Sequence, residues 1–124
     1  MQTVLVIDDE YGIAEVLEAT LLDEGYRVLV AINGRQGLER LQETPADIIL
    51  LDFMMPVMDG PATLKALAAN PAYAAIPVVV MSSLPEDSVA ARSNGGYAAY
   101  LRKPFRLQAV LDKIAEILAA RKRS

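Results

Sequence analysis

The chain has 124 residues, 53% hydrophobic and 23% charged, which is the size and composition of a single folded domain. It contains no Cys and no His, which excludes disulfides, thiol nucleophiles, imidazole bases, phosphohistidine chemistry and the usual zinc ligands. The net charge of -4 argues against direct binding to nucleic acid, and the lack of a basic or long apolar N-terminal segment predicts a cytoplasmic protein without membrane association.

The first part of the chain predicts two strands and the helix between them. A continuous apolar run predicts a strand at Thr3–Ile7, and apolar residues at helical spacing over 13–21 predict a helix that ends at Gly25. The run Arg27–Ala31 mixes polar and apolar side chains, so we place this second strand at an edge of the sheet.

The middle of the chain predicts two helices around the most apolar strand. An Asn-Gly pair at 33–34 begins a helix that stops near Pro45, and Gly37 inside this helix costs about 1 kcal/mol relative to Ala. The strand at 47–51 is expected at the centre of the sheet because it is the most apolar. A further helix is predicted to end before Pro71.

The last part of the chain predicts two more strands and two helices. A strand at 76–81 is followed by Ser83 and Glu86 at capping-box spacing, which predicts a short helix with Ser83 as its cap. A fifth strand is predicted at 98–101, and the final helix has a clear apolar periodicity over 107–118.

These five strand and helix repeats predict a doubly wound α/β fold, with a five-stranded parallel sheet and helices on both faces. Right-handed crossovers, with the less apolar second and fifth strands at the edges, favour the strand order 2-1-3-4-5. In this order the ligand crevice lies beyond the carboxyl ends of the strands, between strands 1 and 3.

Four of the predicted strands end against a side chain that can take part in chemistry. Asp8 and Asp9 follow the first strand, and Asp52 follows the third. Ser82 follows the fourth strand and Lys103 the fifth. We expect all of them at one crevice, where mutual repulsion of the carboxylates requires a cation and oxygen ligands favour Mg²⁺.

Asp52 is the predicted nucleophile of a phosphoryl transfer, because a carboxylate can accept the group as an aspartyl phosphate. The Ser82 hydroxyl, the Lys103 ammonium and Mg²⁺ would then each bind one phosphoryl oxygen. Taken singly, each residue also has a structural explanation, as a helix cap, a turn residue, a strand end or a solvated charge. The convergence of four strand ends on one crevice favours the chemical interpretation.

Four segments of the chain resemble the receiver domain of bacterial two-component response regulators, the family of the chemotaxis regulator. They read VLVIDDE at 4–10, IILLDFMMPVMDG at 48–60, IPVVVMS at 76–82 and YLRKPF at 100–105. The resemblance covers essentially the whole chain. It implies a flavodoxin-like fold and a single receiver domain over residues 1–124 with no effector domain, unless the chain is a piece of a longer regulator.

The resemblance also implies roles for individual residues at matching positions. The implied Mg²⁺ ligands, with Asp9 binding more directly than its neighbour, are Asp8, Asp9, Asp52 and the backbone carbonyl of Met54. Ser82 takes the place of the family's switch hydroxyl and Tyr100 that of its switch aromatic residue. Lys103 takes the place of the family's lysine, and a cis peptide is implied before Pro104.

The function implied by the resemblance is that of a phosphoacceptor in a two-component or phosphorelay system. A partner histidine kinase or phosphotransfer protein would phosphorylate Asp52, and the chain would catalyse only its own phosphorylation and dephosphorylation. Movement of Ser82 and Tyr100 would remodel the surface formed by the fourth helix, fifth strand and fifth helix, where a downstream protein binds. The protein would be a monomer or a phosphorylation-dependent dimer.

Two other functions belong to different classes. The same fold can act as an interaction module that needs no phosphorylation, although the usual mark of such a module, loss of the acceptor or of the acidic pair, is absent here. A phosphatase of the haloacid dehalogenase family also forms an aspartyl phosphate, but that family needs a second carboxylate two residues after the nucleophile, where this chain has Met54.

Overall fold

Five parallel strands form one sheet in the order β2-β1-β3-β4-β5. The computed structural model describes residues 1–123. The strands are β1 (Thr3–Ile7), β2 (Arg27–Ala31), β3 (Ile48–Asp52), β4 (Val78–Ser82) and β5 (Ala99–Arg102). The helices are α1 (Tyr11–Asp23), α2 (Gly34–Glu43), α3 (Gly60–Ala69), α4 (Glu86–Ser93) and α5 (Leu107–Arg123). The predicted doubly wound fold and its strand order are confirmed.

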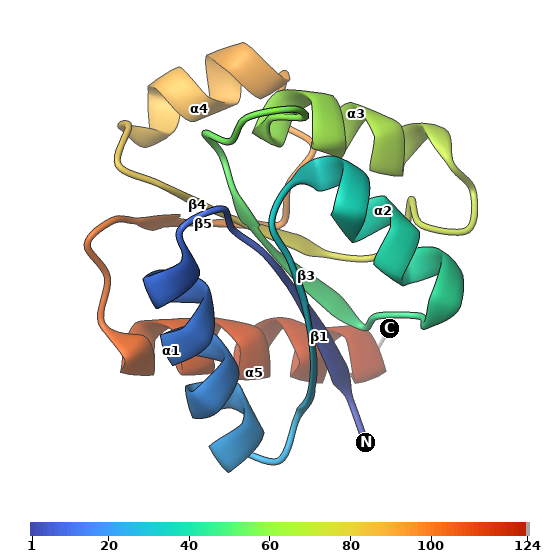
Figure 1. Cartoon of the computed structure of the whole chain (residues 1–124), viewed down its shortest axis with the longest axis vertical. Helices are drawn as coiled ribbons and strands as arrows, with labels where there is room; N and C mark the ends of the chain where they lie inside the picture. Colours follow the sequence, from blue (N-terminus) through green and yellow to red (C-terminus); the bar gives the residue numbers. More distant parts are fainter. Residues whose placement is uncertain (124) are drawn as a thin grey trace.

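Two helix layers cover the sheet (Figure 1), with α1 and α5 on one face and α2, α3 and α4 on the other. Every residue of β1, β3 and β4 is buried, whereas β2 and β5 at the edges are partly exposed. Alternate residues of each central strand pack into different cores, because successive side chains point to opposite faces. The continuous apolar runs of the sequence are explained by this burial on both faces.

Gly37 in α2 has a packing role that offsets its poor helix propensity. A Cβ atom at this position would lie 2.5 Å from the Cδ1 atom of Ile7 in β1. The absence of a side chain therefore lets α2 approach the sheet closely. Gly37 lowers the stability of the helix by about 1 kcal/mol relative to Ala. A larger residue at this position would overlap the side chain of Ile7 in the core.

Three strands end one residue later than predicted. The ladder includes Asp52, which pairs with Met81, and Ser82, which pairs with Arg102. The backbone of a polar residue can still pair with the neighbouring strand at the carboxyl edge of a parallel sheet. The change from apolar to polar side chains therefore comes one residue before the last paired residue of each of these strands.

The prediction that Ser83 caps α4 is wrong. The cap position is taken by Pro85, no side chain caps the helix, and Glu86 is its first residue. The segment before α4 is held instead by the preceding strand, because the Leu84 N–H donates to the Ser82 Oγ at 3.0 Å. The helix thus starts two residues after the position that the capping-box spacing indicates.

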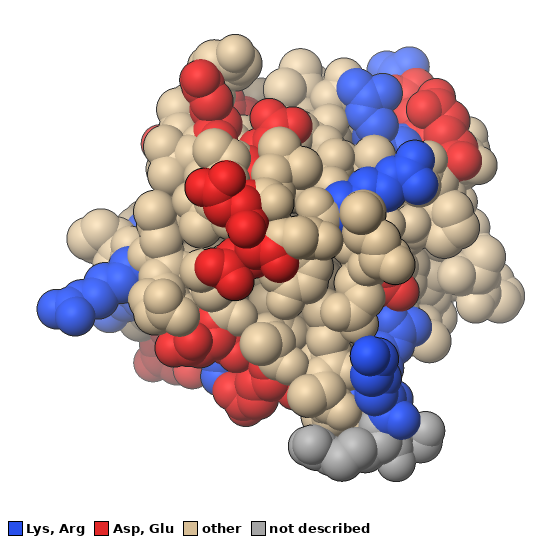
Figure 2. Space-filling view, turned by 90° about the horizontal axis from the view of Figure 1, so that it is seen from below, with Lys and Arg blue, Asp and Glu red and all other residues tan. Residues whose placement is uncertain are grey.

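Acidic side chains gather on one side of the face covered by α1 and α5. Figure 2 shows Asp and Glu mostly across the left half of this face, and Lys and Arg mostly along the right half. The uneven distribution accompanies a net charge of -4. Within residues 1–123, no helix has the length and apolar character needed to cross a bilayer.

Candidate functional site

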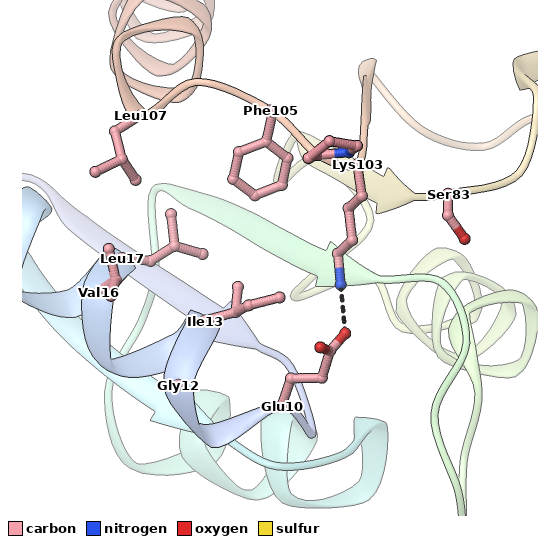
Figure 3. Close-up of a pocket in the computed structure, with 10 residues that line it drawn as sticks. Glu10, Gly12, Ile13, Val16, Leu17, Ser83, Lys103, Phe105 and Leu107 are labelled. Atoms are coloured by element: carbon pink, nitrogen blue, oxygen red, sulfur yellow. Dashed lines mark hydrogen bonds and ion pairs between the residues drawn. The ribbon is translucent and has the colours of Figure 1, made fainter.

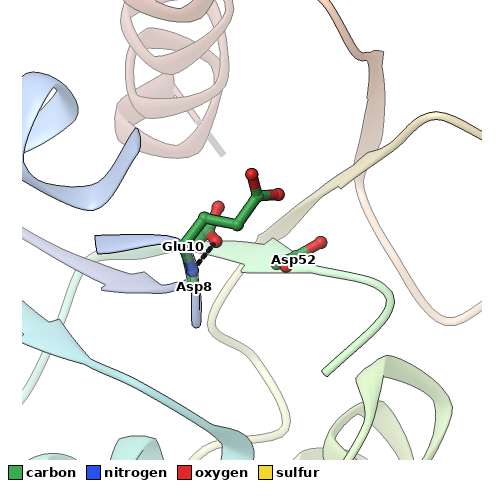
Figure 4. A group of neighbouring side chains, drawn as sticks. All are labelled: Asp8, Glu10 and Asp52. Atoms are coloured by element: carbon green, nitrogen blue, oxygen red, sulfur yellow. Dashed lines mark hydrogen bonds between the residues drawn. The ribbon is translucent and has the colours of Figure 1, made fainter. Parts of the chain in front are cut away.

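The carboxyl ends of β1, β3 and β5 bring four charged side chains together. Asp8 comes directly after β1, Asp52 is the last residue of β3, and Lys103 comes directly after β5. Glu10 is the cap residue of α1, two residues beyond Asp8. Carboxylate oxygens of Asp8, Glu10 and Asp52 all lie within 4.8 Å of one another (Figure 4).

Lys103 is the cation at the centre of this group. Its Nζ lies 3.1 Å from Glu10 Oε1, 3.4 Å from Asp52 Oδ1 and 3.5 Å from Asp8 Oδ2. The Lys103 side chain is 14% exposed, and the Asp8 and Asp52 side chains are 0% and 5% exposed, so water screens these contacts weakly. The backbone N–H of Lys103 donates to the Ser82 carbonyl, which holds the Lys103 backbone beside β4.

Asp52 is a buried carboxyl whose charge is poorly compensated. Burial and the neighbouring charge of Asp8 raise its pKa to about 7, against the opposing effect of Lys103. A hydrogen bond with Asp9 raises the pKa further, and the backbone N–H of Met54 lowers it. The carboxyl is therefore only partly ionised at neutral pH. A nearby divalent cation would favour its ionised form.

The other two buried groups respond to the same surroundings. The pKa of Asp8 is raised, chiefly by burial, although the Glu10 N–H donates to its Oδ1 at 2.8 Å and opposes the shift. Burial lowers the pKa of Lys103, but the hydrogen bond to Glu10 and the charges of Asp52 and Asp8 outweigh it, so the pKa is raised. The ammonium stays protonated and neutralises only part of the acidic group.

The acidic group has the composition of a site for a hard divalent cation. Oxygen-only ligands with several carboxylates suit Mg²⁺, which binds to one or two carboxylates and keeps several waters. Three carboxylates contact the single ammonium of Lys103. Burial is the main cause that raises the pKa values of Asp8 and Asp52, because their charged forms are poorly solvated. The cation that the sequence predicts therefore fits these residues.

Two of the predicted metal ligands have less direct support. Asp9 is exposed and does not belong to the group of close carboxylates, although its side chain contributes to the raised pKa of Asp52. The Met54 N–H donates to Asp52 Oδ1 at 3.5 Å, and its side chain is exposed. Both residues lie beside Asp52, and their roles as metal ligands remain predictions.

Glu10 is the site residue that sequence reasoning missed. It stands third in the acidic run after β1, but the argument from strand ends and the resemblance assigned roles only to Asp8 and Asp9. The available signal was a third carboxylate adjacent to a pair already predicted to bind a cation. The structure turns Glu10 toward Lys103 and leaves Asp9 outside the close group.

The two predicted switch residues are connected through Leu84. Ser82 is 1% exposed, and its Oγ accepts a hydrogen bond from the Leu84 N–H. The hydroxyl of Tyr100 donates to the Leu84 carbonyl, and both side chains pack against the core beneath α2, α3 and α4. One peptide segment thus joins the buried hydroxyl at the end of β4 to the half-buried tyrosine on β5.

The cis peptide expected at Lys103-Pro104 is present.

An apolar cleft adjoins the acidic group. Figure 3 shows Glu10 and Lys103 at one end of it, and Ile13, Phe105 and Leu107 along its walls. The cavity has a volume of about 540 Å³ and lies between α1 and the segment that joins β5 to α5. The charged site therefore opens beside a surface that can bury apolar side chains.

The chain matches the sequence pattern of the response regulator receiver domain over residues 4–115. It is 43% identical over 116 residues to Transcriptional regulatory protein ZraR of Escherichia coli, covering 89% of this chain and 25% of ZraR. It is 35% identical over 114 residues to Protein PilG of Pseudomonas aeruginosa, covering 90% of this chain and 83% of PilG. The chain thus spans about a quarter of the length of ZraR and most of PilG.

Solved structures show the same architecture. The chemotaxis protein CheY4 of Vibrio cholerae superimposes with a TM-score of 0.87 at 29% identity, covering 94% of this chain and 98% of CheY4. The four sequence segments that resemble receiver domains therefore lie in a fold that this chain shares with CheY4.

Proposed function

Because the chain belongs to the response regulator receiver domain family, we propose that it accepts a phosphoryl group on Asp52 in a Mg²⁺-dependent reaction. The observation that carries this proposal is the position of Asp52, which is buried at the end of the central strand β3 and shares the Lys103 ammonium with the Asp8 carboxylate. The donor is a phosphohistidine on a partner histidine kinase or phosphotransfer protein, since this chain has no His.

In the proposed reaction a carboxylate oxygen of Asp52 attacks the phosphorus atom. The new O–P bond forms as the P–N bond to the donor imidazole breaks, and the donor nitrogen keeps the electron pair and takes up a proton. The carboxylates of Asp8 and Asp52 would hold Mg²⁺, which when bound would supply positive charge to the phosphoryl oxygens. Lys103 supplies a second positive charge, and the Ser82 hydroxyl can donate a hydrogen bond to a third oxygen.

Ionisation of Asp52 couples this reaction to the cation. A carboxyl group with a pKa of about 7 is only partly ionised at neutral pH, and the attacking group must be the carboxylate. Cation binding favours ionisation, because a positive charge within a few ångströms stabilises the charged form. The buried site thus gives a reason why the reaction requires a divalent cation.

The output is proposed to be a change in the surface formed by α4, β5 and α5, read by a downstream protein. When Ser82 moves toward a phosphoryl oxygen, its hydrogen bond from the Leu84 N–H is perturbed, and Leu84 in turn holds the Tyr100 hydroxyl. Tyr100 lies on β5, so the change reaches the proposed surface through a single peptide segment.

Intact-mass analysis after exposure to acetyl phosphate tests the proposal. We expect a mass gain of one phosphoryl group with Mg²⁺ and no gain with a chelator or in Asp52→Asn. Asp23→Asn is the matched control, because Asp23 is an exposed carboxyl at the end of α1. A gain that persists in Asp52→Asn would remove Asp52 from the proposed role.

The switch predicts a specific response to beryllofluoride, which mimics a phosphoryl group. With Mg²⁺ present, we expect amide signals of Ser82, Leu84 and Tyr100 to shift strongly. Signals of α2, which α3 separates from α4 (Figure 1), should shift little. Heteronuclear NMR measures both sets at once. If beryllofluoride left the signals of the switch segment unchanged, an interaction module that needs no phosphorylation would become the better explanation.

A further inference from the structure

Lys103 is shared among three carboxylates that differ in exposure. The contact with Glu10 is the shortest at 3.1 Å, and Glu10 is 57% exposed, whereas the two aspartates are almost completely buried. Glu10 therefore holds the ammonium from the outer rim of the pocket, while Asp8 and Asp52 contact it from within. Figure 3 shows the Lys103 and Glu10 side chains extending toward one another across this rim.

Hydrogen bonds hold the backbone of Glu10 in place, whereas its exposed side chain contacts Lys103 and makes no cap bond to α1. The Glu10 N–H donates to Asp8 Oδ1 at 2.8 Å, and the Glu10 carbonyl accepts from the Ala14 N–H at 3.0 Å as α1 begins. The Glu10 side chain makes no cap hydrogen bond to α1. Rotation of this side chain alone can therefore release Lys103 without disturbing β1 or α1.

We propose that Glu10 is a positioning residue for Lys103, which holds the ammonium at the rim of the acidic pocket and releases it when an anionic group binds at Asp52. The inference rests on the proposed function. A phosphoryl group on Asp52 and the Glu10 carboxylate compete for the same three N–H donors of Lys103. Glu10 thereby sets how readily Lys103 reaches the phosphoryl oxygens, and so how tightly the modified state is held.

Replacement of Glu10 by the isosteric Gln removes the competitor. At saturating Mg²⁺ we expect Glu10→Gln to bind beryllofluoride about two- to fivefold more tightly, the fold-change that corresponds to loss of a partly exposed ion pair. The affinity is measured by NMR titration. Glu15→Gln is the matched control, an exposed carboxylate on the same helix, and is expected to bind as the unmodified protein does.

Two further measurements separate positioning from a general charge effect. The Nζ and Cε signals of Lys103 should shift in Glu10→Gln without any ligand and stay unchanged in Glu15→Gln. In a Lys103→Met background, Glu10→Gln should give no gain in beryllofluoride affinity. An unchanged affinity, unchanged Lys103 signals, or a gain that persists without Lys103 would each overturn the inference.

Failure of the proposed function gives a different result. If the unmodified protein did not bind beryllofluoride with Mg²⁺, the result would contradict the proposal that Asp52 accepts a phosphoryl group. The Lys103 signals would still report whether Glu10 holds the ammonium in the unliganded protein. A shift there without beryllofluoride binding would leave Glu10 as an anchor of Lys103 and overturn its proposed role in phosphoryl binding.

Discussion

Asp52→Asn is expected to stabilise the metal-free protein by about 2–4 kcal/mol at pH 8, even though it removes the proposed phosphoacceptor. Asp52 is 4% exposed, and burial together with the charge of Asp8 raises its pKa from 3.8 to about 7. At pH 8 the folded protein must keep this carboxyl ionised in unfavourable surroundings. An amide of the same shape avoids that cost, and it also relieves the repulsion on Asp8.

The sign of the pH dependence follows from proton binding. Between pH 3.8 and about 7 the folded protein retains a proton on Asp52 that the unfolded chain has released. The stability of the unmodified protein therefore falls as the pH rises through this range, and the fall ends above the folded pKa. The advantage of Asp52→Asn should accordingly be small near pH 4 and largest above pH 7.

Chemical denaturation in the presence of a chelator, repeated from pH 4 to pH 8, measures this advantage. Asp23→Asn controls for the loss of one exposed carboxyl, and it should change stability little across the range. Added Mg²⁺ should stabilise the unmodified protein more than Asp52→Asn, because the proposed metal site includes the Asp52 carboxylate of the folded state. An Asp52→Asn variant less stable than the unmodified protein at pH 8 would contradict the assigned electrostatics.

Gly60→Ala is expected to destabilise the protein by about 2–3 kcal/mol, because an added methyl group has no space. A Cβ atom at Gly60 would lie 2.7 Å from both the Cα and the carbonyl oxygen of Phe53. These are backbone atoms, which a rotamer change cannot move. Phe53 follows Asp52 directly, and its carbonyl accepts the Gly60 N–H at 2.9 Å, so the displaced segment is the one that carries the proposed acceptor.

Gly12→Ala is the matched control for this substitution. Nothing lies within 4 Å of a Cβ at Gly12, which is in the first turn of α1, so Ala there should be neutral or stabilise the protein by up to about 1 kcal/mol. Denaturation midpoints compare the two variants, and intact-mass analysis with acetyl phosphate should show slower modification of Gly60→Ala. Equal stability of Gly60→Ala and the unmodified protein would mean that α3 is not held against the β3 segment as the structure shows.

The sequence predicted the site to the level of strand ends. Asp8, Asp52 and Lys103 converge as the order 2-1-3-4-5 requires, because parallel strands place their carboxyl ends at one edge. The sequence analysis assigned Asp9 to the metal site and gave Glu10 no role, and it could not show which of the two side chains turns toward Lys103. That choice depends on the backbone path between β1 and α1, where Glu10 adopts φ -85° and ψ 100°.

Local pattern reasoning failed where contacts between distant segments decide the structure. Ser83 has the spacing of a helix cap, but α4 begins after Pro85 because the end of β4 holds the preceding segment through Ser82 and Leu84. Gly37 is unfavourable in a helix by propensity, but it packs closely against the side chain of Ile7. In both cases a tertiary contact outweighs a local preference of about 1 kcal/mol.

The sequence by itself determined the order of strands and helices, the burial of the central strands, and the residue types at the carboxyl edge of the sheet. These follow from apolar periodicity and strand ends, which are local properties of the chain. Only the tertiary structure decided which carboxylates meet Lys103 and how far the pKa of Asp52 rises. Both depend on distances and burial between segments remote in sequence, since electrostatic energies vary with separation and solvent exposure rather than with position along the chain.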